Sequence, residues 1–246
     1  MAVVADRFGA YCERGADVAP APAFAFPRPR AEVRRSSLLG WIAQARDRTG
    51  ATGEDEIAAL RAALRRQGAT RRLVARALGA IGRLAYATIG LNPHDVQYLA
   101  AWEMLRGRMV EMQTGEGKTL VAALVAGAHG LAGRAVHVVT ANDYLAARDA
   151  DAMGPLLGAL GLRVRCVQAG DGDDERRESY GADIVYVTAK SLMFDYLRDL
   201  DRVCRKFVDN IAASCKHLHG VDLQVDDAVI ERIVKSTAAC EGSSRV

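Results

Sequence analysis

Residues 114–119 combine the residue types that hold a phosphate. Their sequence, Thr-Gly-Glu-Gly-Lys-Thr, follows a short apolar run and precedes a run with helical character. Gly115 and Gly117 let the backbone curl so that successive N–H groups point toward phosphate oxygens. Lys118 would reach the β- and γ-phosphates, and the Thr119 hydroxyl would coordinate Mg²⁺. We therefore predict a nucleotide-phosphate site made of Thr114, Gly115, Glu116, Gly117, Lys118 and Thr119.

The loop departs from the usual phosphate-loop pattern at one position. The pattern G-x-x-x-x-G-K-[ST] would place its first glycine at residue 112, where this chain has Met112. The interpretation therefore depends on the strand–loop–helix context, and a purely structural glycine turn is the alternative. A dinucleotide-binding turn is excluded because the third glycine of G-x-G-x-x-G is missing.

The hydrophobic pattern from residue 109 onward alternates between strands and helices. Such alternation is typical of a parallel sheet flanked by helices, in which the carboxyl ends of the strands carry the working surface. The fold class we predict is therefore α/β. We expect strands at 109–112, 135–140, 163–168 and 184–187, and helices at 118–131, 142–160, 173–180 and 191–199.

Four parts of the chain differ in character. Alternating prolines rule out a helix near the end of residues 1–35. Within residues 36–90, apolar residues recur at helical spacing. We predict a flexible Pro/Ala-rich lead-in at 1–35, a helical N-terminal segment at 36–90, a partial nucleotide-binding domain at 91–199 and a divergent helical tail at 200–246.

Charge is unevenly distributed along the 246 residues, whose net charge is +3. Up to Arg108 the chain has 17 arginines, no lysine and 10 acidic residues. A basic front half favours acidic lipid or nucleic acid, and a solvated helix face is the alternative. No run reads as a membrane span or a signal peptide, so we expect a cytoplasmic protein. Five scattered cysteines fit reduced thiols rather than a disulfide framework.

The sequence contains, in this order, the blocks NPHDVQ (92–97), VEMQTGEGKT (110–119), HVVTANDYLAARDA (137–150), ADIVYVT (182–188) and FDYLRD (194–199). Together these blocks resemble the SecA family of bacterial preprotein translocase ATPases. DEAD-box helicases share the glycine-loop block loosely and lack the other distinctive ones. The resemblance implies the first domain of an ATP-driven motor, with a P-loop RecA-like parallel sheet flanked by helices and preceded by a helical segment.

The resemblance also implies the ligands and partners. It assigns adenine contact to Gln97, whose amide can both donate to and accept from an adenine edge. His94 stands where the family has Phe, which would loosen that pocket. ATP and Mg²⁺ are the implied cofactors. The implied partners are unfolded preproteins, the membrane protein-conducting channel and acidic lipid, with no nucleic acid, and the implied location is cytoplasmic with peripheral association to the inner membrane.

One departure from the family concerns hydrolysis. The family carries an Asp-Glu box soon after the FDYLRD block, where the aspartate orients Mg²⁺ and the glutamate orients the attacking water. This sequence has no such box there. Asp226 and Asp227, at the end of VDLQVDD, are the candidate catalytic substitutes, and ordinary surface carboxylates are the alternative.

We also expect the family's second RecA-like domain, with its arginine finger, to be missing from this chain. We therefore expect a chain that binds ATP and hydrolyses it poorly unless a second chain completes the motor. Three functions stay open: a motor fragment of protein export, a nucleic-acid helicase-like module, and a non-catalytic ATP-binding or interaction fragment.

Overall fold

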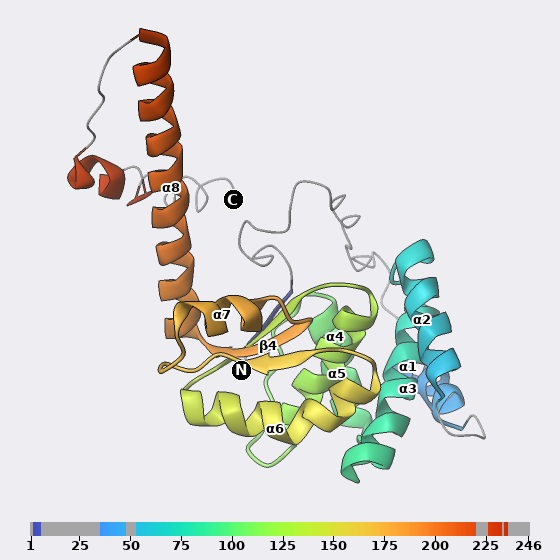
Figure 1. The fold of residues 1–246 in the computed structure, drawn as a ribbon. Coiled ribbons are helices and arrows are strands. Elements are labelled where there is room, and N and C mark those ends of the chain that lie inside the picture. The colour runs from blue at the N-terminus through green and yellow to red at the C-terminus, as the bar shows by residue number, and fades with distance from the viewer. Residues whose placement is uncertain (1, 6–34, 48–52, 220–225, 233, 236–246) are drawn as a thin grey trace. The chain divides into compact units, whose positions relative to one another are not determined.

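The computed structural model describes residues 2–5, 35–47, 53–219, 226–232 and 234–235 (Figure 1). The chain divides into two compact units after Ala189. In chain order the elements are β1 (Ala2–Ala5), α1 (Arg35–Arg46), α2 (Glu54–Gln67), α3 (Arg71–Ile89), α4 (Asp95–Leu105), α5 (Lys118–Leu131), β2 (Val136–Thr140), α6 (Asp143–Ala159), β3 (Val164–Cys166), α7 (Asp173–Tyr180), β4 (Ile184–Thr188) and α8 (Ala189–His219).

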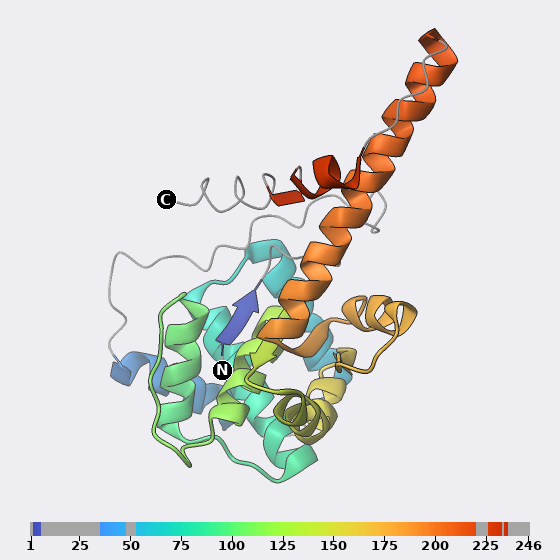
Figure 2. The same cartoon turned by 90° about the vertical axis from the view of Figure 1, so that its left-hand side faces the viewer.

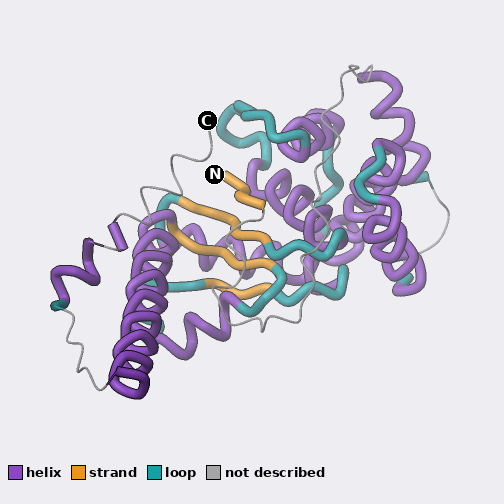
Figure 3. Tube along the Cα trace, turned by 90° about the horizontal axis from the view of Figure 1, so that it is seen from above, coloured by secondary structure: helices purple, strands orange, loops and turns teal. Residues whose placement is uncertain are grey.

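The strands form one four-stranded sheet in the order β1-β2-β4-β3 (Figure 3). β2, β4 and β3 run parallel, and β1 pairs antiparallel with β2. All five residues of β4 are buried, as expected for a central strand covered on both faces. The predicted α/β fold with a parallel sheet is therefore confirmed.

Helices cover the sheet and bury the apolar core of the first unit (Figure 2). α5 and α6 both pack against β2, and α3 packs against α1, α5 and α6. Asn142 begins α6 just beyond the carboxyl end of β2, because its Oδ1 accepts a hydrogen bond of 2.8 Å from the Leu145 N–H. The core includes the fully buried side chains Leu78, Ile81, Leu124, Leu156 and Tyr186.

Three expectations about elements need correction. Residues 109–112 are not a strand, and Met109 in this segment is fully exposed. The edge of β2 that faces away from β4 is paired with β1 instead. The lead-in prediction for 1–35 missed β1, although residues 6–34 lie outside the described residues. The helix expected at 191–199 is part of α8, which runs on to His219. None of the described helices is long and apolar enough to span a membrane.

Two helices approach closely where Gly82 of α3 faces Tyr98 of α4. Tyr98 is fully buried, and its hydroxyl has no hydrogen-bond partner among the described residues. A Cβ added at Gly82 would lie 1.8 Å from that hydroxyl oxygen. Burial raises the pKa of Tyr98 to about 12, since the charged form is disfavoured away from water.

We expect Gly82→Ala to lower the free energy of unfolding by about 2 kcal/mol, because overpacking outweighs the better helix propensity of alanine. Tyr98→Phe should remove the worst clash and leave only the tight contact of 2.9 Å with the ring carbon Cζ, so the double variant should regain part of that loss in chemical denaturation. Gly158→Ala in α6 is the matched control, since nothing lies within 4 Å of its added Cβ. Equal effects of the two alanine substitutions would contradict the packing argument.

Candidate functional site

The predicted phosphate loop lies between α4 and α5, and two of its glycines have positive φ. The φ angles are 91° at Gly115 and 77° at Gly117, values that favour glycine over any residue with a Cβ. Gly117 directly precedes Lys118, the first residue of α5. The first N–H groups of a helix have no intrahelical acceptor and lie at the positive end of its dipole. The geometry is therefore that of an anion-binding turn.

The loop is held in shape by contacts among its own residues. Lys118 Nζ donates to the Gln113 carbonyl oxygen at 2.5 Å. The Gln113 N–H donates to Glu116 Oε2 at 2.7 Å, and the Glu116 N–H donates to the Gln113 carbonyl at 3.3 Å. Phosphate oxygens are charged and form stronger hydrogen bonds than a carbonyl, so a phosphate would compete well for the ammonium group.

Gln97 connects the start of α4 to this loop. Its side chain is buried, with 6% exposure. The Oε1 accepts from the His94 N–H at 2.8 Å, and the Nε2 donates to the Glu116 carbonyl at 2.8 Å. Each end of a primary amide has capacity for a second hydrogen bond. Contact with adenine through that capacity stays a prediction, while the link from α4 to the loop is a structural role that the sequence did not indicate.

The block before α4 is also tied to α1. Arg46 Nη2 donates to Asn92 Oδ1 at 3.0 Å, and the same guanidinium lies 5.6 Å from the centre of the Tyr98 ring. His94 itself is exposed. The N-terminal helices thus help to position the Asn92–Gln97 block.

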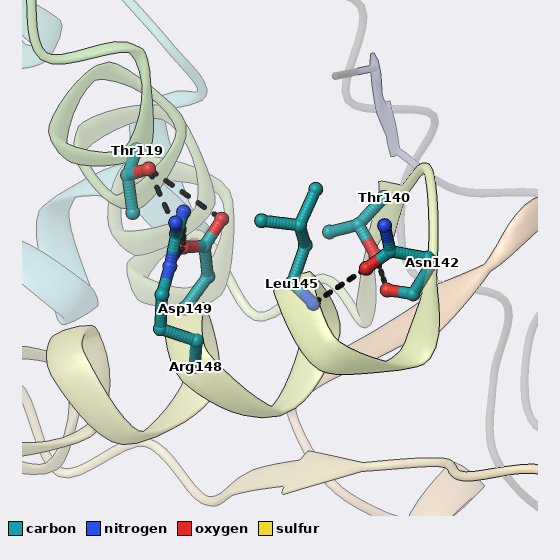
Figure 4. A network of polar contacts seen from close by, with 6 residues as sticks. All are labelled: Thr119, Thr140, Asn142, Leu145, Arg148 and Asp149. Carbon is teal, nitrogen blue, oxygen red and sulfur yellow. Dashed lines mark hydrogen bonds and ion pairs between the residues drawn. The ribbon is translucent and has the colours of Figure 1, made fainter.

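A buried carboxylate of α6 lies beside Thr119 at the start of α5 (Figure 4). Asp149 of α6 is 3% exposed, and its Oδ2 and Oδ1 lie 3.4 and 3.5 Å from the Thr119 hydroxyl oxygen. Arg148 Nη2 contacts Asp149 Oδ1 at 2.6 Å. The sequence prediction assigned no role to Asp149. The available signal was a charged residue on the apolar face of a helix, between the buried Ala146 and Met153.

Asp226 and Asp227 are exposed at the start of a short helical segment. Asp227 Oδ1 accepts from Arg205 at 2.6 Å, and Asp226 Oδ1 accepts from the Ala228 N–H at 3.0 Å. Asp227 is helical, and residues 221–225 of VDLQVDD lie outside the described residues. Their metal role stays a prediction. Within the described ranges, no three His, Cys, Asp or Glu side chains gather closely enough to hold a metal ion.

The parallel order β2-β4-β3, the helices packed on these strands and the glycine turn that opens α5 define a RecA-type α/β domain. A model of the SecA DEAD-like domain matches residues 38–221. The chain belongs to the SecA family.

Individual relatives agree with this assignment. The chain is 56% identical over 115 residues to protein translocase subunit SecA 2 of Mycolicibacterium smegmatis, a match that covers 47% of this chain and 15% of that protein. It is 45% identical over 156 residues to the chloroplastic protein translocase subunit SecA of Ostreococcus lucimarinus, covering 62% and 17%. The matched segment is thus about one sixth of the length of these relatives.

Proposed function

We propose that this chain binds ATP with Mg²⁺ and acts as part of a motor for protein export. The observation that carries the proposal is the turn at residues 113–119, where two glycines of positive φ and Lys118 open α5 in a chain of the SecA family. In this proposal Gly115, Glu116, Gly117 and Lys118 hold the phosphates, Thr114 flanks them, and Gln97 contacts adenine. Thr119 supplies a hydroxyl oxygen, a ligand type that suits Mg²⁺.

The names of the relatives, which are translocase subunits, support a role in protein translocation. Unfolded preproteins, a membrane channel and acidic lipid are the partners we propose, at the cytoplasmic face of the inner membrane. Exposed arginines on α2 and α3 support contact with anionic lipid: Arg65, Arg66, Arg72 and Arg76. Completion of the motor by a second chain belongs to the same proposal.

Equilibrium titration with a fluorescent ATP analogue in Mg²⁺ tests the binding step, and it should give saturable binding that unlabelled ATP reverses. Steady-state hydrolysis should then be measured alone, with an unfolded polypeptide, with vesicles rich in anionic lipid, and with RNA. We expect low basal turnover and a response to polypeptide or lipid. A response to RNA alone would instead support the helicase-like alternative.

A further inference from the structure

The carboxylate of Asp149 lies next to the hydroxyl that the proposed function assigns to Mg²⁺ (Figure 4). Thr119 is the second residue of α5, and Asp149 lies in the middle of α6. The two side chains thus meet across two packed helices, 30 residues apart in the sequence.

Burying a carboxylate is unfavourable unless partners compensate its charge. Arg148 contacts one oxygen only, with Nη2 at 2.6 Å and Nε at 3.0 Å from Asp149 Oδ1. Among the described residues, the hydrogen-bond partner of Oδ2 is the Thr119 hydroxyl at 3.4 Å. The arginine therefore leaves one carboxylate oxygen directed toward Thr119.

The distance between the two side chains is informative. O–H···O hydrogen bonds are usually about 2.7–2.8 Å long, so contacts of 3.4 and 3.5 Å hold the hydroxyl only weakly. A hydroxyl that coordinates a cation uses an oxygen lone pair, and its proton then needs an acceptor on the other side. Asp149 is the acceptor within reach.

We propose that Asp149 is a positioning residue for the metal–nucleotide complex. Its carboxylate accepts the Thr119 hydroxyl proton in a hydrogen bond and thereby turns the oxygen lone pairs toward Mg²⁺. This inference rests on the proposed function, because it requires the loop to bind a Mg²⁺-nucleotide.

Tyr186 of β4 lies in the same interior as Asp149. It is fully buried, and its hydroxyl has no hydrogen-bond partner among the residues described. Burial raises the pKa of Tyr186, and the negative charge of Asp149 raises it further. The Asp149 carboxylate thus lies in a buried interior, where charge is screened less than at the surface.

The test is the ratio of ATP affinities measured with Mg²⁺ and with excess EDTA. We expect Asp149→Asn to reduce this ratio by about tenfold, while its affinity in EDTA stays within about twofold of the unsubstituted chain. Thr119→Val should reduce the ratio similarly, and the double variant should show little further loss. Asp151→Asn is the matched control, an exposed aspartate on the same helix, and it should leave the ratio unchanged.

Arg148→Gln separates positioning from a merely structural role. If the ion pair within α6 only stabilises that helix, Arg148→Gln and Asp149→Asn should lower the ratio equally, and that result would overturn the inference. If Asp149 positions the hydroxyl, the arginine variant should keep the ratio. Asp149→Ser, which is smaller and uncharged, should reduce the ratio too, and circular dichroism identifies the variants that are folded.

Failure of the inference can be distinguished from failure of the proposed function. An unsubstituted chain that binds no ATP in either buffer contradicts the function, and the inference falls with it. An unsubstituted chain that binds more tightly in Mg²⁺, with the same ratio in folded Asp149→Asn, contradicts the inference alone.

Discussion

Replacing Lys118 by alanine should weaken ATP binding by about 100-fold. A hydrogen bond made by a charged group contributes about 1.5–3 kcal/mol, and the ammonium group is the main positive charge of the loop. In the structure this group already lies at the loop, donating to the Gln113 carbonyl. Binding of a fluorescent ATP analogue measures the loss directly, and hydrolysis by this variant should fall to the background of the assay.

Lys118→Arg provides the matched control for charge. It keeps the positive charge and changes the shape of the donor group, so it should retain more affinity than the alanine variant. Thermal unfolding of all three proteins checks that the fold is retained, because Lys118 is exposed and supports little packing. Unchanged ATP affinity in Lys118→Ala would remove the basis for a phosphate site at this loop.

Gly117→Ala should be the more damaging of the two glycine-to-alanine substitutions in the loop, lowering ATP affinity by about 100-fold. Its φ of 77° costs a residue with a Cβ about 1–2 kcal/mol. The new Cβ would also lie 2.3 Å from Gln97 Nε2. A glutamine end group can swing aside, but doing so would break its hydrogen bonds to His94 and Glu116, at about 1 kcal/mol each.

Gly115→Ala is the comparison that isolates the contact with Gln97. Gly115 also has a positive φ, of 91°, but nothing lies within 4 Å of its added Cβ. Strain alone should lower affinity by about five- to tenfold. Combining Gly117→Ala with Gln97→Ala should cost less than the sum of the single effects. Equal losses of ATP affinity in the two glycine variants would show that the Gln97 side-chain amide does not lie against Gly117 as described.

The parts of the fold that the sequence predicted well are those governed by local pattern. The helix expected at 142–160 is observed at 143–159, because Asn142 is a strong N-terminal cap and apolar residues recur on one face. The strand expected at 184–187 is observed at 184–188, since a continuous apolar run favours a central strand. Local spacing also placed the two glycines and Lys118 correctly at the start of α5.

The errors concern features that depend on distant residues. The 109–112 segment has strand-like residues, but a strand needs a hydrogen-bonded neighbour, and the β2 edge is paired with residues 2–5. The position of Asp149 beside Thr119 could not be predicted either, because it depends on how α5 packs against α6. The double attachment of Gln97 likewise depends on two backbone groups 22 residues apart, at positions 94 and 116.

The attachment of Gln97 at both ends has a dynamic consequence. One amide restrains the first turn of α4 and the backbone of the glycine loop together, so any rearrangement of the loop must be transmitted to that turn. Ligand occupancy should therefore change amide hydrogen exchange at the beginning of α4 as well as in the loop. When a ligand orders the glycine loop, the first turn of α4 also becomes more ordered and has less entropy left to lose. This effect would couple the two segments, although they belong to no common helix or strand.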